Sequence, residues 1–233
     1  MKTQLLCSSL LLVMALSACK TAQVQLKTNH NTPMDVYPVE GRNDWRWKRK
    51  VTFGEYTASN FRGGWVGSYE FPFFLQFRGS KEKISFVQRD QMGGEAKVLA
   101  VDRFRTAELP LVKDYFNLPV VYKQNFAGTV YLPARQQHYD FWLNFPDANT
   151  PLTRTEGFIL TPQGKVTIEG IQQLEGMTFK LPGNLGYNFI YAGEVVASVD
   201  AMAKGTVYLK KELDPEMKLV LVAVANSILQ RTK

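Results

Sequence analysis

Apolar segments of strand length alternate with turn signals through most of this 233-residue chain. Residues 83–88 and 98–104 flank a Met-Gly-Gly-Glu turn, and residues 158–160 and 166–168 flank a Thr-Pro-Gln-Gly turn. Glycine adopts the positive φ that tight hairpins require, and proline presets the first position of a turn. Turns that recur about every ten residues are typical of antiparallel sandwiches and barrels. The sequence therefore predicts a mainly β fold, an antiparallel β-barrel or sandwich.

Other segments fit this pattern or interrupt it. A β-type stretch begins at Val51, and residues 69–77 form an aromatic stretch in which Pro72 predicts an edge strand or a bulge. Residues 106–125 and 146–154 contain proline and turn-forming residues and predict two long loops. Long loops often carry binding sites, although they also serve as surface decoration.

The C-terminal part of the chain predicts a buried helix. Asp214 is a suitable N-cap, Pro215 suits the first helical position, and Glu216 complements the helix dipole. Residues 219–225 are apolar on every side, so a helix there must be buried all round. The valines leave a buried strand as the alternative.

The end of the chain resembles a known architecture. Residues 193–199, residues 205–209 and the apolar helix that begins at Asp214 are similar to the end of tubby-like and phospholipid-scramblase-like domains. In those families a closed antiparallel barrel surrounds a hydrophobic helix. The resemblance is one of hydrophobic pattern, and it implies the same arrangement here. No phosphoinositide-binding residue is matched, so none is carried over.

The N-terminus resembles that of bacterial lipoprotein precursors. Lys2 precedes an apolar segment at 5–16 that is too short to span a bilayer, and Leu16-Ser17-Ala18-Cys19 resembles a lipobox. The resemblance implies that Cys19 becomes the mature N-terminus and carries fatty-acyl chains such as palmitate. An ordinary cleaved signal peptide would not need this cysteine. An apolar helix of the folded domain would not precede the polar stretch at 20–31.

We therefore expect a signal peptide at 1–18, an acylated cysteine and spacer at 19–44, and a single β-rich domain at 45–233. One short strand is expected within the spacer, at 34–39. Lys20 stands where enteric lipoproteins retained in the inner membrane carry Asp. The sorting rule of those lipoproteins thus favours the outer membrane of the cell envelope.

Cysteine use excludes several chemistries. Cys7 lies in the signal peptide, and the thiol of Cys19 would be blocked by lipid. The mature body then has no disulfide, cysteine nucleophile or thiolate metal site. Its stability must come from packing.

A basic and aromatic cluster follows the spacer. Alternation places Trp45 and Trp47 on one face of an extended segment and Arg46 and Lys48 on the other. The cluster predicted to contact the membrane surface comprises Trp45, Arg46, Trp47, Lys48, Arg49 and Lys50. Tryptophan favours membrane interfaces, and basic side chains attract anionic head groups. The alternative is a first strand with tryptophans inward and a charged exterior. The net charge of +7 is also compatible with an ordinary solvated surface.

No motif specifies a reaction. The chain has two histidines, His30 in the spacer and His138. His138 and Asp140 share one face of an expected strand, where they could form an acid–base pair or a structural pair. The glutamates considered as a glycosidase-like pair, with solvated strand faces as the alternative, are Glu156, Glu169, Glu175 and Glu194.

Other sites are not indicated. Ser68 does not fit a nucleophile elbow, and the histidines lack the spacing of metal ligands. Phosphate-loop, dinucleotide-binding and nucleic-acid-binding motifs are absent, so we expect no cofactor, metal or nucleic-acid partner.

The leading hypothesis is a lipid-anchored envelope lipoprotein whose β-domain binds or scaffolds a partner without catalysis. That partner would be an envelope protein, a lipid or a glycan. The alternatives are an envelope hydrolase that uses His138 and Asp140 or paired carboxylates, and a lipid-binding barrel. The last alternative requires that the C-terminal helix does not fill the barrel.

The substitution Cys19→Ser tests the anchor. Because a single cysteine would carry all acyl chains, the variant should move from the membrane fraction to the soluble fraction of the envelope. Fractionation and immunoblotting of both proteins would measure this. Continued tight membrane retention of the variant would contradict the lipobox interpretation.

Overall fold

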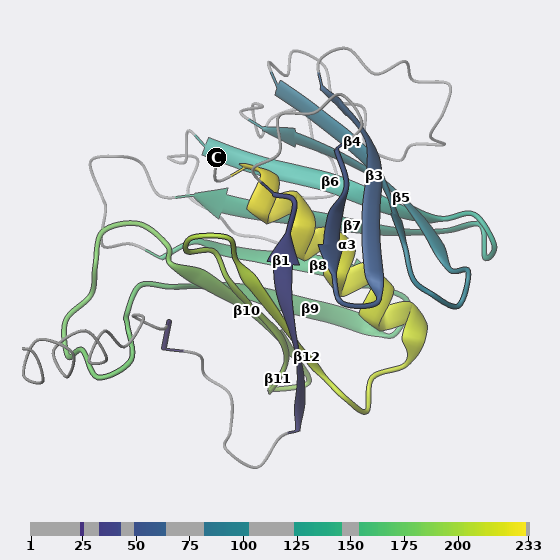
Figure 1. The fold of residues 1–233 in the computed structure, drawn as a ribbon. Coiled ribbons are helices and arrows are strands. Elements are labelled where there is room, and N and C mark those ends of the chain that lie inside the picture. Colours follow the sequence, from purple (N-terminus) through teal and green to yellow (C-terminus); the bar gives the residue numbers. More distant parts are fainter. Residues whose placement is uncertain are drawn as a thin grey trace, which may run out of the picture.

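The computed structural model describes residues 24–25, 33–42, 49–63, 82–102, 124–145 and 154–231. These residues form twelve strands and one helix (Figure 1). The strands are β1 (Met34–Glu40), β2 (Val51–Phe53), β3 (Tyr56–Gly63), β4 (Glu82–Arg89), β5 (Glu95–Asp102), β6 (Gln124–Leu132), β7 (Gln137–Phe145), β8 (Glu156–Thr161), β9 (Gly164–Ile171), β10 (Gly186–Tyr191), β11 (Glu194–Asp200) and β12 (Thr206–Lys210). The helix is α3 (Pro215–Arg231).

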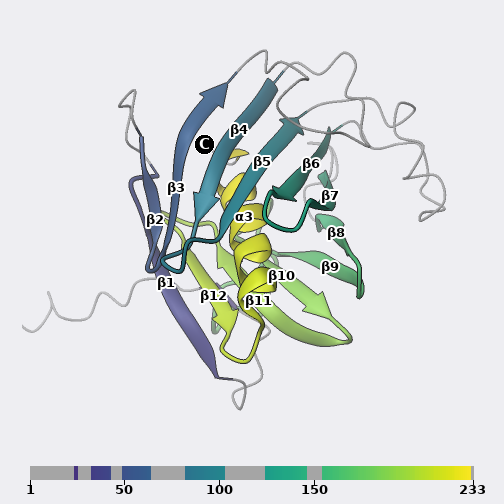
Figure 2. The same ribbon diagram turned by 90° about the vertical axis from the view of Figure 1, so that its right-hand side faces the viewer.

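The strands form a closed antiparallel barrel in chain order. Each strand pairs with the next, and β1 pairs with β12 to close the sheet (Figure 2). The predicted hairpins are confirmed: β4 pairs with β5 around the glycine turn, and β8 pairs with β9 around the Pro-Gln-Gly turn. The prediction of a mainly β fold is confirmed as a barrel.

The closing strand comes from residues that the sequence analysis assigned to the spacer. In β1, Met34 lies opposite Lys210 and Val39 lies opposite Phe53. The short strand expected at 34–39 is therefore present, and it belongs to the barrel. The spacer assignment of 19–44 needs this correction, because without β1 the sheet would have two open edges. The aromatic stretch at 69–77 lies outside the described residues.

The helix prediction is confirmed over the strand alternative. α3 begins at Pro215, and the Asp214 carboxylate accepts a hydrogen bond from the backbone N–H of Met217 at 2.8 Å. All residues from Leu219 to Gln230 are buried. Figure 2 shows α3 running through the interior of the barrel. The predicted antiparallel barrel with a hydrophobic C-terminal helix is therefore confirmed.

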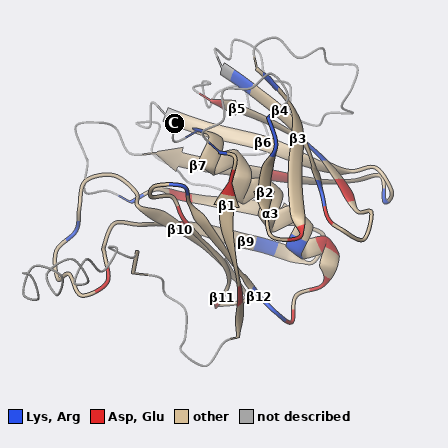
Figure 3. Cartoon of the chain, in the orientation of Figure 1, with Lys and Arg blue, Asp and Glu red and all other residues tan. Residues whose placement is uncertain are grey.

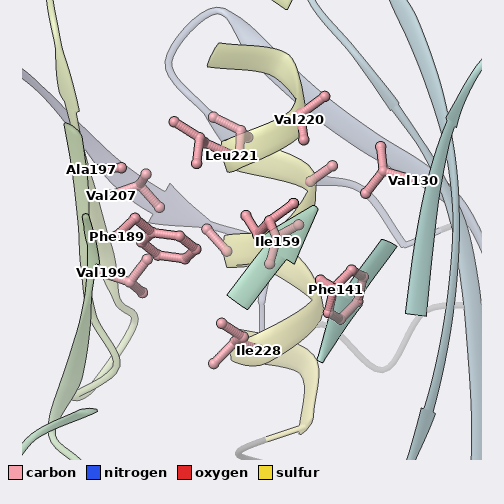
Figure 4. Packing of buried hydrophobic residues seen from close by; sticks show 14 of the residues in the cluster. Val130, Phe141, Ile159, Phe189, Ala197, Val199, Val207, Val220, Leu221 and Ile228 are labelled. Carbon is pink, nitrogen blue, oxygen red and sulfur yellow. The ribbon is translucent and has the colours of Figure 1, made fainter. Parts of the chain in front are cut away.

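The core lies between α3 and the inner face of the barrel. Figure 4 shows Val220 pointing toward Val130, while Leu221 points to the opposite side, toward Ala197 and Val207. These side chains belong to one buried hydrophobic cluster. Every second side chain of a strand points into the barrel, and the helix presents apolar side chains in every direction. The barrel interior is therefore filled.

The two ends of the barrel differ in their connections. At one end, which we call the long-connection end, strands are joined by residues 41–50, 64–81, 103–123, 146–155, 172–185 and 201–205. At the other, the short-turn end, they are joined by residues 54–55, 90–94, 133–136, 162–163 and 192–193. The last turn of α3 lies at the long-connection end, where the Arg42 side chain donates to the Leu229 carbonyl at 3.1 Å. Most connections at the long-connection end therefore contain more residues than those at the short-turn end.

Replacing Leu221 with alanine should destabilise the protein, because Leu221 is fully buried between helix and barrel. Truncation of such a side chain costs about 3 kcal/mol in free energy of unfolding. Urea unfolding followed by circular dichroism would measure the change. Met92→Ala is the matched control: its side chain is 77% exposed, and we expect almost no change. Equal effects of the two substitutions would contradict the helix-filled core.

Candidate functional site

The N-terminal segment at Val24 and Gln25 docks on the outside of the barrel. Val24 forms an antiparallel bridge with Leu174, and the Gln25 N–H donates to the Gln173 carbonyl at 3.0 Å. Val24 is only 5% exposed. A Cβ atom at Gly186 would lie 3.2 Å from its side chain, so the absence of a side chain at this glycine permits the close approach. The segment therefore has a fixed position beside the start of β10.

The connection between β9 and β10 is folded back onto the same region. The Leu181 N–H donates to the Gln172 carbonyl at 2.7 Å. The Asn184 amide donates to the Thr155 hydroxyl at 2.6 Å and accepts from the Thr155 N–H at 3.3 Å. A Cβ atom at Gly170 would lie 2.0 Å from the Asn184 amide oxygen, so glycine is required there. These bonds hold residues 172–185 against β8 and β9.

A cavity of about 380 Å³, lined by mostly polar residues, lies between these two segments and the outer face of the barrel. Its lining combines four amide side chains with two cationic ones and a short stretch of β9. The lining residues are Gln25, Arg154, Gly170, Ile171, Gln172, Gln173, Lys180 and Asn188. We call this cavity the amide pocket.

The charge at one wall of the amide pocket is largely compensated. Arg154 forms two hydrogen bonds with the Glu169 carboxylate, at 3.1 and 3.3 Å, and a third with Glu156 at 3.4 Å. Lys180 adds an exposed cation at the rim. Elsewhere, charged residues of both signs are spread over the strands and their connections (Figure 3). The pocket thus has no strong field of one sign.

Asn188 is the most informative residue of the amide pocket. It lies on the outer face of β10, between the inward-facing Tyr187 and Phe189, and is 1% exposed. Its amide oxygen accepts a hydrogen bond from the Ser198 hydroxyl at 2.8 Å. Its amide nitrogen has no hydrogen-bond partner within the described part of the protein. A buried donor without an acceptor costs free energy, and an acceptor on a bound molecule would remove that cost.

The predicted membrane-contact cluster is only partly visible. Residues 45–48 lie outside the described residues, and Lys50 is exposed. The Arg49 guanidinium packs on the Phe61 ring, 4.3 Å from its centroid, and donates to the Gln230 side chain. Burial lowers the pKa of Arg49. Arg49 therefore contacts the end of α3, and contact of the rest with a membrane stays a prediction.

Arg49 belongs to a polar group at the end of α3. Gln230 donates to Asn226 at 2.9 Å, and Asn226 donates to Gln88 on β4 at 3.3 Å. Arg231 donates to Asp102 on β5 at 2.9 Å and lies 3.5 Å from the centroid of the Phe145 ring. These contacts fix the last turn of the helix to the barrel wall, and we assign them a structural role.

His138 and Asp140 share the outer face of β7, as the alternation predicted, and their action as an acid–base or structural pair stays a hypothesis. His138 stacks on the Tyr131 ring of β6 at a centroid distance of 4.6 Å. Burial raises the pKa of the Asp140 carboxyl, while the Thr129 hydroxyl and His138 act in the opposite direction. His138 therefore makes a cross-strand aromatic contact. His30 lies outside the described residues, and those residues contain no cluster of metal-ligating side chains.

The four glutamates are distributed over separate contacts. Glu156 and Glu169 lie opposite each other on β8 and β9, where both bind Arg154. Glu194 binds Lys210 at 2.7 Å, and this hydrogen bond lowers the pKa of its carboxyl. Glu175 is exposed on the β9–β10 connection. Of the four, only Glu156 and Glu169 are paired across strands, and Arg154 binds them both.

Comparison with known proteins gives no identification. No family model, no curated protein and no solved structure matches this chain. Within the described residues, no helix has both the length and the apolar character needed to cross a membrane. Any function must therefore be argued from the residues and their geometry.

No sequence pattern predicts the amide pocket. Its residues are ordinary polar residues from four separate segments, and no spacing connects them. One signal was present: Asn188 and Ser198 interrupt apolar strands at outward positions. Asn188 and Ser198 form a hydrogen bond with each other on the outer face of the barrel. The N-terminal segment docks beside this face.

The substitution Asp102→Ala should destabilise the protein, since it would leave the largely buried Arg231 side chain without its carboxylate. Removing one partner of a buried ion pair costs about 3 kcal/mol. Thermal or urea unfolding would measure the loss. Glu95→Ala is the control, because its ion pair with Arg89 is partly exposed and should contribute less than about 1 kcal/mol. Similar losses for the two variants would contradict the structural role of the pair.

Proposed function

We propose that this protein is a lipid-anchored lipoprotein of the bacterial envelope whose barrel is a binding domain without catalytic activity. The observation that carries the proposal is the amide pocket, with the amide nitrogen of Asn188 buried in its wall and without a partner among the described residues. Acylation of Cys19 rests on the lipobox-like sequence. The pocket gives the anchored domain a defined place to bind a partner.

The chemistry of the pocket favours a hydroxyl-rich, uncharged group. The Gln25, Gln173 and Asn188 side chains are amides, which provide donors and acceptors suited to hydroxyl groups. Arg154 already binds Glu169, so it can donate to a hydroxyl without requiring an anion. A cavity of about 380 Å³ is of the size that small ligands occupy. We infer that the ligand is a glycan, one or two sugar units of which enter the pocket.

Two observations favour binding over the alternatives. Arg154 binds both Glu156 and Glu169, which makes this pair a structural ion-pair group rather than an acid and a base around an open bond. α3 occupies the interior of the barrel, where a lipid-binding barrel would hold its ligand. The amide pocket on the outer wall of the barrel is then the site for a partner.

Binding of the full mature chain carrying Cys19→Ser to an array of neutral and acidic oligosaccharides tests this proposal. We expect a neutral oligosaccharide to bind, and Asn188→Ala to weaken that binding about tenfold through loss of one buried hydrogen bond. Isothermal titration calorimetry would measure the affinities.

Arg89→Ala is the control, because Arg89 lies at the short-turn end and should leave affinity unchanged. Circular dichroism would verify that each variant is folded. Absence of binding across the array, or equal affinity of the Asn188 variant and the parent, would contradict the proposal.

A further inference from the structure

The β9–β10 connection exposes two large apolar side chains that are two positions apart in the sequence. Among the described residues, the exposed large hydrophobic ones are Val36, Met92, Met177 and Phe179. Met177 and Phe179 are 37% and 58% exposed and are two positions apart on one connection. Val36 and Met92 are isolated on β1 and on a short turn. Exposed apolar side chains that cluster often mark an interaction surface.

The N-terminal segment docks on the same connection. Val24 bridges Leu174, three positions before Met177, and the Gln25 N–H bonds to Gln173. The segment that leads from Val24 back to Cys19 therefore leaves the barrel at this part of the surface. The position of Val24 is set by the barrel, because its side chain is buried.

The length of the tether limits where the membrane can be. Cys19 precedes Val24 by five positions, and an extended chain spans at most about 3.5 Å per residue. The acylated Cys19 therefore cannot lie more than about 18 Å from Val24. A membrane that holds the acyl chains lies within this distance of the β9–β10 connection.

We propose that the barrel sits on the phospholipid bilayer with its long-connection end toward the membrane and with Met177 and Phe179 inserted at the interface. This inference rests on the proposed acylation of Cys19. The neighbouring Lys180 is exposed and lies at the level of the lipid head groups. Glu175, on the same connection, is exposed as well, so insertion of the apolar side chains rather than net charge carries the contact. The short-turn end faces away from the bilayer.

Site-specific fluorescence quenching tests this orientation. The mature body has no other thiol, and the thiol of Cys19 is blocked by acylation, so an introduced cysteine can be labelled alone. The acylated protein carrying Phe179→Cys or Met177→Cys would be labelled with an environment-sensitive fluorophore. It would then be reconstituted into phosphatidylethanolamine–phosphatidylglycerol vesicles that contain a spin-labelled lipid. Met92→Cys is the control, because Met92 is 77% exposed at the short-turn end.

We expect several-fold stronger quenching at positions 177 and 179 than at position 92. Equal quenching at the three positions, or stronger quenching at position 92, in protein that floats with the vesicles would overturn the orientation and leave the anchor intact. Failure of the acylated protein to float with vesicles would overturn the anchor and the orientation together. Glycan binding by the non-acylated chain is measured without lipid, so its outcome is separate from both.

Discussion

Burial of α3 inside the barrel is the interaction on which the rest of the structure depends. A helix that is apolar in every direction has no stable exposed face, and a barrel of twelve strands has an interior that a single layer of inward side chains does not fill. The barrel buries the apolar surface of the helix, and the helix fills the interior of the barrel. Val220 and Leu221 point to opposite sides of the helix and meet opposite walls of the barrel (Figure 4). The number and stagger of the strands set the diameter of the barrel, and the helix fills the interior that this diameter leaves.

Local chemistry made much of this fold predictable. Hairpins such as β8–β9 depend on a few turn residues that are adjacent in sequence, and Asp214 caps α3 within its own first turn. The amide pocket depends on contacts between distant residues. Val24 approaches Leu174 across most of the chain, and Asn188 is buried only because that region is covered. Arg49 likewise looked like a surface residue, but it binds Gln230 on the terminal helix. Such pairings leave no trace in local sequence patterns.

The two ends of the barrel differ in the structural features that they carry. Tight turns at the short-turn end keep neighbouring strands in register, and the glycines in them satisfy a backbone requirement. The docked N-terminal segment, the amide pocket and the exposed Met177 and Phe179 all belong to the long-connection end. Changes at the exposed positions Met177 and Phe179 would leave the strand pairing and the buried face of α3 untouched. Changes at Arg42 or Arg49 would not, because these side chains hold the last turn of α3.

The position of α3 after the strands also determines when the core can form. The twelve described strands are synthesised before the helix that fills them, so the barrel has an incomplete core until α3 is available. β1 adds to this delay, because its partner β12 directly precedes the helix. The core of the barrel is therefore completed last, when the helix that follows β12 has entered it.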